Sequence, residues 1–534
     1  MKNHSRAESV GGGFISGVFI LSLSTLIVKI IGLAFKIPML SLLGMEGMGY
    51  FNSAYEVYAL LCVVSTAGLP VALSILISSA RATENKSGVV KAYRAAIKVF
   101  FAIGLIGTVG MLIFARPLST WIGNNEAFYC IIGIAPALFF ICLASAMRGF
   151  CQGFEDMKPT AISQLIEALS KLLLGISFAM IGIKNDFSVP IISVLAVFGI
   201  TVGTALSLCY LALAKRKHTV GLQTKSKDRP QGYYRELLRI ALPITLGSAV
   251  ISLTRIIDMA LIMRRLQEIG VSQFRANEIY GAYTTLALPV FSLIPSLITP
   301  ISMALIPELT VFIKKNSFIG QTQAVEKSLR LTSLLSMPAS LAVTVFSRQI
   351  LSLLFSGQAE AVEIAAPLLS LLGGSVFFSC LITTTNAILQ AYGCVKMPIF
   401  SMSAGVAVKA FVSYFLLGTR SVGVYGAPIG SLACNVTVVL LNFALMLRYT
   451  NGAEESLSLS RCFVKPFVSS VFSIGGAYAL YRWISTEFFS DAVAFSIAAA
   501  IAILVYFLLV ILFGVLGKDD IRAIPIFKKI IKEK

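Results

Sequence analysis

The chain has 534 residues, of which 57% are hydrophobic and 13% are charged, and its formal net charge is +19. A mean hydropathy of +0.86 over this length excludes a soluble globular protein and indicates a helical protein that crosses a membrane many times. The positive charge lies mainly in short loops between apolar segments, which is the pattern that orients membrane proteins and not that of a nucleic-acid-binding surface.

The first apolar segment, residues 14–43, carries two lysines in its interior. At 1.5 Å per residue the segment is long enough to cross a bilayer with some tilt. Lys29 lies near its centre, and Lys36 follows two helical turns later. Because a lysine at bilayer depth costs about 3 kcal/mol, we expect both side chains to face protein or water and not lipid.

The apolar pattern continues along the chain and predicts about fourteen helical spans. They cover residues 13–43, 49–80, 90–114, 127–147, 159–182, 188–214, 236–264, 279–313, 326–347, 362–391, 396–418, 422–448, 462–484 and 490–516. The long polar connection divides the chain into an N-terminal lobe at 1–214, a basic linker at 215–235, a C-terminal lobe at 236–450 and a final segment at 451–534 with two further spans and a basic tail.

Lysine and arginine outside the spans concentrate on the side of the N-terminus. This asymmetry predicts that the N-terminus, the linker and, with an even number of spans, the C-terminal tail are cytoplasmic. The two lobes also resemble each other, since Lys29-Ile30-Ile31 matches Arg255-Ile256-Ile257 and Lys171 matches Lys409. A repeat of about six spans keeps its orientation, so we expect two parallel lobes around a central cavity.

Lys29 and Arg255 occupy equivalent places in the two lobes, and we expect both to face that cavity. Two cations together suit a diphosphate, because they can share its charge. The alternative is that each cation pairs with a neighbouring acid, and Asp258 lies three residues after Arg255.

The other charges within the spans have similar alternatives. Lys36 and Glu56 are expected at similar depth, so they form either a structural bridge or a gate and substrate contact. Lys171 has Glu167 one turn before it, whereas Lys409 has no acid at helical spacing. Both lysines are candidates for the cavity lining. The spans hold more cations than acids, which favours an anionic ligand.

The sequence offers no pattern for catalysis or for a bound cofactor. Its nine cysteines are scattered and its two histidines stand apart, so we expect neither a disulfide framework nor a metal site. Nucleotide-binding and catalytic-triad motifs are absent from the sequence as well. We therefore expect a protein that is not an enzyme and carries no cofactor.

Five stretches resemble a known superfamily; they are residues 28–58, 66–78, 148–167, 288–310 and 512–529. They resemble the polysaccharide-lipid flippases of the multidrug/oligosaccharidyl-lipid/polysaccharide (MOP) exporter superfamily. In combination they are similar to the stage V sporulation protein B group, relatives of the lipid II flippase MurJ. MurJ proteins usually carry an Arg-Asp pair where this chain has Phe35-Lys36, and an arginine where it has Tyr283-Thr284, which favours the sporulation-type group.

This resemblance implies a two-lobed transporter in a bacterial plasma membrane. It implies flipping of an undecaprenyl-diphosphate-linked sugar, lipid II or a similar precursor, for peptidoglycan or spore cortex assembly by alternating access. The family's basic positions in the first span carry over to Lys29 and Lys36, and that in the seventh span to Arg255. The two extra C-terminal helices would hold the lipid tail.

Other functions remain open. One is a MATE-type cation or drug antiporter, which needs buried acids, and another is a flippase for a different lipid-linked unit, such as an exopolysaccharide or teichoic acid precursor. A third, without transport, is a scaffold for cell-wall enzymes. The expected partners are a lipid-linked oligosaccharide and membrane lipid, with cell-wall synthesis enzymes as further candidates and no nucleic acid.

Overall fold

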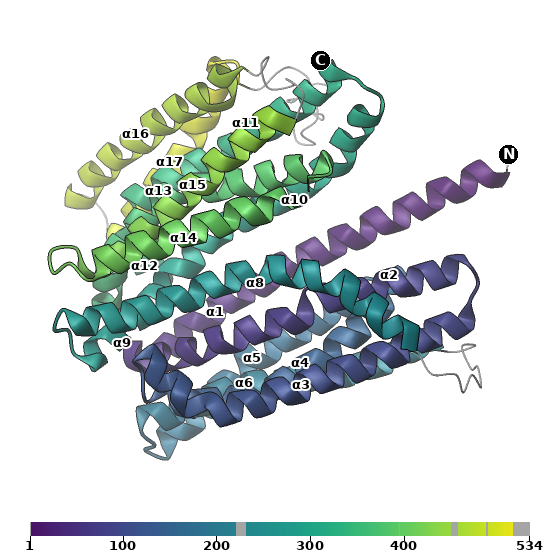
Figure 1. Cartoon of the computed structure of the whole chain (residues 1–534). Helices are drawn as coiled ribbons and strands as arrows, with labels where there is room; N and C mark the ends of the chain where they lie inside the picture. The colour runs from purple at the N-terminus through teal and green to yellow at the C-terminus, as the bar shows by residue number, and fades with distance from the viewer. Residues whose placement is uncertain (1, 220–230, 395, 450–457, 488–489, 516–534) are drawn as a thin grey trace. The chain divides into compact units, whose positions relative to one another are not determined.

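The computed structural model describes residues 2–219, 231–394, 396–449, 458–487 and 490–515. Within those ranges the chain consists of helices and the turns between them and contains no strand. Thirteen of the described helices are long and apolar enough to cross a membrane. The predicted fold class, an all-α polytopic membrane protein, is therefore confirmed (Figure 1).

Most connections between consecutive helices are short. In chain order the elements are α1 (Lys2–Thr66), α2 (Gly68–Ala82), α3 (Lys86–Ile122), α4 (Ala127–Gly153), α5 (Lys158–Lys184), α6 (Val189–Ala214), α7 (Arg216–Thr219), α8 (Gln231–Glu268), α9 (Gln273–Ala282), η1 (Tyr283–Ala287), α10 (Leu288–Lys314), α11 (Phe318–Val345), α12 (Ser347–Leu354), α13 (Ala359–Ala391), α14 (Met397–Leu417), η2 (Gly423–Tyr425), α15 (Gly426–Tyr449), η3 (Ser460–Val464), α16 (Lys465–Glu487) and α17 (Asp491–Leu512). The elements η1 and η3 are π-helical turns, and η2 is a short 3-10 helix.

Helix α1 contains a reversal of the chain. Gly44 has φ 66° and ψ −177°, a backbone conformation that glycine adopts without steric cost. The rings of Phe35 and Phe51 lie on either side of this turn with centroids 5.7 Å apart, whereas a straight helix would separate the two residues by about 24 Å. The candidate span Leu23–Ala82 therefore contains two crossings, which accounts for the difference from the predicted number of spans.

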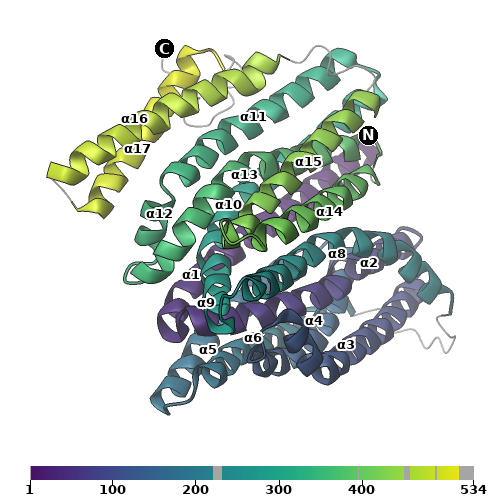
Figure 2. The same ribbon diagram turned by 60° about the vertical axis from the view of Figure 1, so that its left-hand side comes forward.

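The chain divides into two compact units. Unit 1 comprises Met1–Thr285 with Ser413–Val424, and unit 2 comprises Leu286–Val412 with Tyr425–Lys534. In unit 1, α1 packs against α4, α5, α6, α8 and α9, and α4 packs against α3 and α6 (Figure 2). Helix α1 is thus the element around which unit 1 is built.

The predicted lobes at 1–214 and 236–450 stay a prediction, and the structure groups α8 and α9 with the first six helices because both pack against α1. The end of α14 also belongs to unit 1, where Arg265 Nε donates to the carbonyl oxygen of Tyr414 at 3.1 Å. Residues 220–230 of the predicted linker, and residues 450–457, 488–489 and 516–534 of the final segments, lie outside the described residues.

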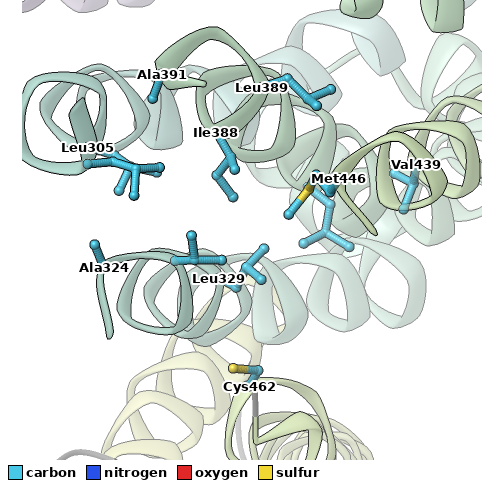
Figure 3. Packing of buried hydrophobic residues seen from close by; sticks show 12 residues of the cluster. Leu305, Ala324, Leu329, Ile388, Leu389, Ala391, Val439, Met446 and Cys462 are labelled. Carbon is cyan, nitrogen blue, oxygen red and sulfur yellow. The ribbon is translucent and has the colours of Figure 1, made fainter. Parts of the chain in front are cut away.

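Unit 2 has its own core. Leu305 of α10, Leu329 of α11, Ile388 of α13 and Met446 of α15 are buried together, with Cys462 of η3 at one side (Figure 3). Helices α16 and α17 pair with each other, and α16 packs against α11. In a bilayer such contacts are stabilised by close van der Waals packing more than by removal of apolar surface from water.

In unit 1 the buried Arg148 of α4 links three helices. Its Nε donates to Ser163 Oγ at 2.9 Å, and its Nη2 donates to Glu167 Oε2 at 3.0 Å, both on α5. Nη2 also donates to Ser207 Oγ of α6 at 3.2 Å. A buried charge with several hydrogen-bond partners is stable only while those partners are present. This network therefore fixes the mutual positions of α4, α5 and α6.

We expect Arg148→Ala to lower the free energy of unfolding by about 2 kcal/mol, because it leaves the Glu167 carboxylate without its cation. Thermal unfolding of the purified protein in detergent measures the effect as a lower Tm. The double variant Arg148→Ala with Glu167→Ala should recover part of the loss, since it removes the uncompensated charge. An unchanged Tm in the single variant would contradict the role of this network.

Candidate functional site

The structure brings most of the predicted site residues into unit 1. Lys29 and Lys36 lie on α1 before the turn at Gly44, and Glu56 lies on α1 after it. Lys171 lies on α5, and α8 carries the remaining two, Arg255 and Asp258. Lys409 lies on α14 in unit 2, where it is buried.

Arg255 pairs loosely with Glu56. Arg255 Nη1 lies 3.9 Å from Glu56 Oε1, which is too long for a hydrogen bond. The Arg255 side chain is 55% exposed, whereas that of Glu56 is 13% exposed. The sequence offered Asp258 as an alternative partner for Arg255, but the acid in this ion pair is Glu56. The guanidinium thus keeps donors that are accessible to a ligand.

Lys36 is held by backbone and not by an acid. Its Nζ donates to the carbonyl oxygen of Thr284 at 2.6 Å. Thr284 lies in the π-helical turn η1, where the regular helical hydrogen bonding changes. Glu56 attracts Lys36 electrostatically but forms its ion pair with Arg255. Of the two alternatives for Lys36, a bridge to Glu56 or a gate and substrate contact, the ion pair that Glu56 forms with Arg255 does not favour the bridge.

Lys171 lies against three aromatic rings. Its Nζ is 4.8 Å from the ring centroid of Phe35, 5.6 Å from that of Phe51 and 4.7 Å from that of Tyr55. Each cation–π contact away from water is worth about 1–2 kcal/mol. The expected local bridge to Glu167 is replaced, because Glu167 forms its hydrogen-bonded ion pair with Arg148.

The cations influence one another. Arg255 repels Lys29 electrostatically, and Lys36 is repelled by both Lys171 and Arg255. Three acids lie nearby: Glu56 attracts Arg255 and Lys36, and Asp258 repels Glu56. Glu167, which pairs with Arg148, attracts Lys171. We call Lys29, Lys36, Lys171 and Arg255, together with Glu56 and Asp258, the cationic cluster. Its excess of positive charge suits an anion.

Sequence reasoning missed a polar contact that joins α1 to α9 and to the π-helical turn η1 that follows it. Asn52 Nδ2 donates to Thr284 Oγ1 and to Thr285 Oγ1, both at 2.9 Å. Beside it the backbones touch, since a Cβ added to Gly281 would lie 2.1 Å from the carbonyl oxygen of Met45. We call this contact the α1–α9 junction. The sequence signal for this junction is a glycine on one helix, Gly281, and an amide side chain on the other, Asn52, because small residues allow close backbone contact and amides form hydrogen bonds between helices.

The described residues include no group of three or more His, Cys, Asp or Glu side chains placed to hold a metal ion. The charged groups of the cationic cluster instead offer donors to an anionic oxygen. Lysine ammonium groups act as point charges, and the arginine fork adds directional hydrogen bonds. The arrangement is suited to holding a ligand of two or more negative charges.

Comparison with known proteins identifies related chains. Residues 14–312, more than half of the chain, match the family model described as polysaccharide biosynthesis protein, and residues 243–415 match the MatE model. Stage V sporulation protein B of Bacillus subtilis (strain 168) is 24% identical over 530 residues, covering 97% of this chain and 99% of that protein. The lipid II flippase MurJ of the same organism is 24% identical over 538 residues, covering 96% and 97%.

A solved structure shares the fold. The lipid II flippase MurJ in its inward closed conformation superimposes with a TM-score of 0.71 at 16% sequence identity, covering 93% of this chain and 99% of that one. At this identity the likeness establishes the helical arrangement, whereas the chemistry of the site depends on the residues described above.

We expect Gly281→Ala to loosen the α1–α9 junction, because the added methyl group would clash with the Met45 carbonyl and overpacking costs about 1–3 kcal/mol. Hydrogen exchange of the backbone amides around residues 45–53 and 276–282 should then accelerate about tenfold. Gly110→Ala on α3 is the matched control, since no atom lies within 4 Å of its added Cβ. Equal exchange rates in both variants would show that the junction is not tightly packed.

Proposed function

Because the chain belongs to the polysaccharide biosynthesis protein family, we propose that it is a flippase for an undecaprenyl-diphosphate-linked saccharide. The substrate would be lipid II or a similar precursor of cell wall or spore cortex. The curated relatives that match nearly end to end carry names consistent with this role. The chain is a multi-pass membrane protein, and we propose that it lies in a bacterial plasma membrane with both termini cytoplasmic.

The cationic cluster is the observation that carries this proposal. A diphosphate brings more negative charge than the single carboxylate of Glu56, so it competes well for Arg255, whose present ion pair is 3.9 Å long. Lys29, close enough to Arg255 for the two charges to repel each other, gains stability when an anion lies between them. The cluster therefore binds a diphosphate by relieving repulsion that the ligand-free protein contains.

The remaining cations would have supporting roles. Lys36 donates to the Thr284 carbonyl of η1, so its charge would act on the ligand from a fixed place between α1 and η1. The positive charge of Lys171, held beside the rings of Phe35 and Tyr55, would attract the ligand without contacting it. Lys409 of unit 2, its counterpart in the predicted repeat, stays a predicted cavity residue. Transport would proceed by alternating access, with the saccharide in aqueous space and the polyprenyl chain beside α16 and α17 in lipid.

A cation antiporter is the second candidate, and the match of residues 243–415 to the MatE model favours it. Such a protein needs acids that bind protons, sodium or cationic drugs. Glu56 and Asp258 are the acids of the cluster, but the four cations outnumber them and repel a cationic ligand.

We expect Lys29→Ala and Arg255→Ala to lower the rate of lipid II flipping in proteoliposomes at least about tenfold each, because each removes a charge that binds the diphosphate. Lys98→Ala is the matched control, since Lys98 is an exposed lysine of α3 outside the cluster. Wild-type rates in both cluster variants, with normal folding and insertion, would refute the proposed role of the cations.

We expect a soluble polyprenyl-diphosphate analogue to bind more tightly than a cationic dye such as ethidium, and its affinity to fall as the salt concentration rises, because exposed charges are screened. Titration calorimetry of the protein in nanodiscs measures both. Tight ethidium binding that is lost in Glu56→Gln would favour the antiporter.

A further inference from the structure

Unit 1 contains a cavity of about 300 Å³ beyond the cationic cluster. Its floor is formed by Tyr50, Asn124 and Asn277, all three buried. Tyr50 and Glu56 lie on the same stretch of α1, so the cavity floor is displaced from the cluster by about 9 Å along the helix axis. The volume is sufficient for a small polar group but not for a lipid tail.

The floor presents amide groups held in fixed orientations. Asn124 Nδ2 donates to Asn277 Oδ1 at 2.7 Å and to Ser53 Oγ at 3.1 Å. Asn277 Nδ2 in turn donates to the carbonyl oxygen of Glu46 at 2.8 Å. Within the described part of the chain, the buried Oδ1 of Asn124 accepts no hydrogen bond. This oxygen is fully buried and closed to a ligand, so the amides of the cavity that a ligand can reach are those of Asn125 and Gln273.

The rim of the cavity is formed by Asn125, Glu126, Gln273 and Phe274. Phe274 is 52% exposed, so an aromatic face is available to a ligand. Two amides and one carboxylate accompany it. Glu126 is the one carboxylate among the lining residues, which include no lysine, arginine or histidine, so the cavity repels phosphate and accepts an uncharged polar group.

We propose that this amide cavity binds the saccharide of the lipid-linked substrate, and that it takes a sugar bearing an acetamido group. Side-chain amides both donate and accept, which complements an acetamido group and its neighbouring hydroxyls, and an exposed phenylalanine stacks on the apolar face of a sugar ring. The assignment to a lipid-linked substrate rests on the proposed flippase function, whereas the sugar chemistry follows from the cavity lining.

The two sites lie along the same stretch of α1. A diphosphate at the cationic cluster and a sugar in the amide cavity would be separated by a distance comparable with the displacement of about 9 Å between Glu56 and Tyr50. The two sites have opposite charge preference, because cations dominate the first and Glu126 the second. An elongated molecule with an anionic end and a neutral sugar end is therefore held in one direction.

The test uses two disaccharides that differ in their acetamido groups. Full-length protein in nanodiscs is titrated with N,N′-diacetylchitobiose and with cellobiose, and binding is followed by saturation-transfer-difference NMR. We expect diacetylchitobiose to bind with a Kd roughly three- to tenfold lower, as one or two amide hydrogen bonds require. Equal affinities, or no binding of diacetylchitobiose, would overturn the proposal.

Variants of the rim locate the binding. Phe274→Ala and Gln273→Ala should each raise the Kd for diacetylchitobiose roughly three- to tenfold, because one removes the stacking face and the other an amide partner. Phe187→Ala is the matched control, since Phe187 is 45% exposed in the turn after α5 and does not line the cavity. Wild-type affinity in both rim variants would show that the sugar binds elsewhere.

Flipping assays separate this inference from the proposed function. If the wild-type protein flips a diphosphate-linked saccharide, Phe274→Ala should raise the substrate concentration needed for half-maximal rate, whereas the control Phe187→Ala should leave it unchanged. Normal flipping by the wild type together with no effect of the rim variants on binding or transport overturns the amide cavity alone. Binding of diacetylchitobiose without any flipping supports the cavity and refutes the flippase.

Discussion

The structure depends on how positive charge is held among apolar helices. Each of three cations in unit 1 has a different partner: a backbone carbonyl for Lys36, three aromatic rings for Lys171 and a distant carboxylate for Arg255. A full complement of acids would have neutralised the cluster and left nothing for a ligand. Carbonyls and ring faces stabilise a cation while its net charge persists. The cluster is therefore both tolerated by the fold and available to an anion.

The sequence was sufficient for the fold class and for the helices, because the length and hydropathy of a span are local properties. Local patterns also identified the interior charges, since a lysine within an apolar segment is conspicuous. Their partners could not be predicted in this way. The partner of Lys36 is a backbone carbonyl, that of Thr284, and every residue has one, so the residue types do not identify it. The rings around Lys171 come from both halves of α1, which meet only because the chain reverses at Gly44.

Reasoning from helical spacing overestimated how often charged residues form ion pairs with residues of the same helix. Asp258 follows Arg255 at helical spacing, and Glu167 precedes Lys171 likewise, yet Arg255 pairs with Glu56 and Glu167 pairs with Arg148. Pairs on one helix are worth only about 0.2–0.5 kcal/mol, so a partner on a neighbouring helix easily outweighs them. The α1–α9 junction was missed for a related reason: its residues are uncharged, and their role depends on two backbones in contact.

The ring of Phe35 shows how a charge on one helix depends on a side chain from another. Phe35 lies on α1 before the turn at Gly44, and the amine of Lys171 on α5 lies 4.8 Å from the centroid of its ring. The positive charge comes from α5, and the ring face that supports it comes from α1. An aliphatic residue at position 35 would therefore remove one of the three ring faces that stabilise the Lys171 ammonium group, and the charge would then depend on Phe51 and Tyr55 alone among the aromatic rings that contact it in the described residues.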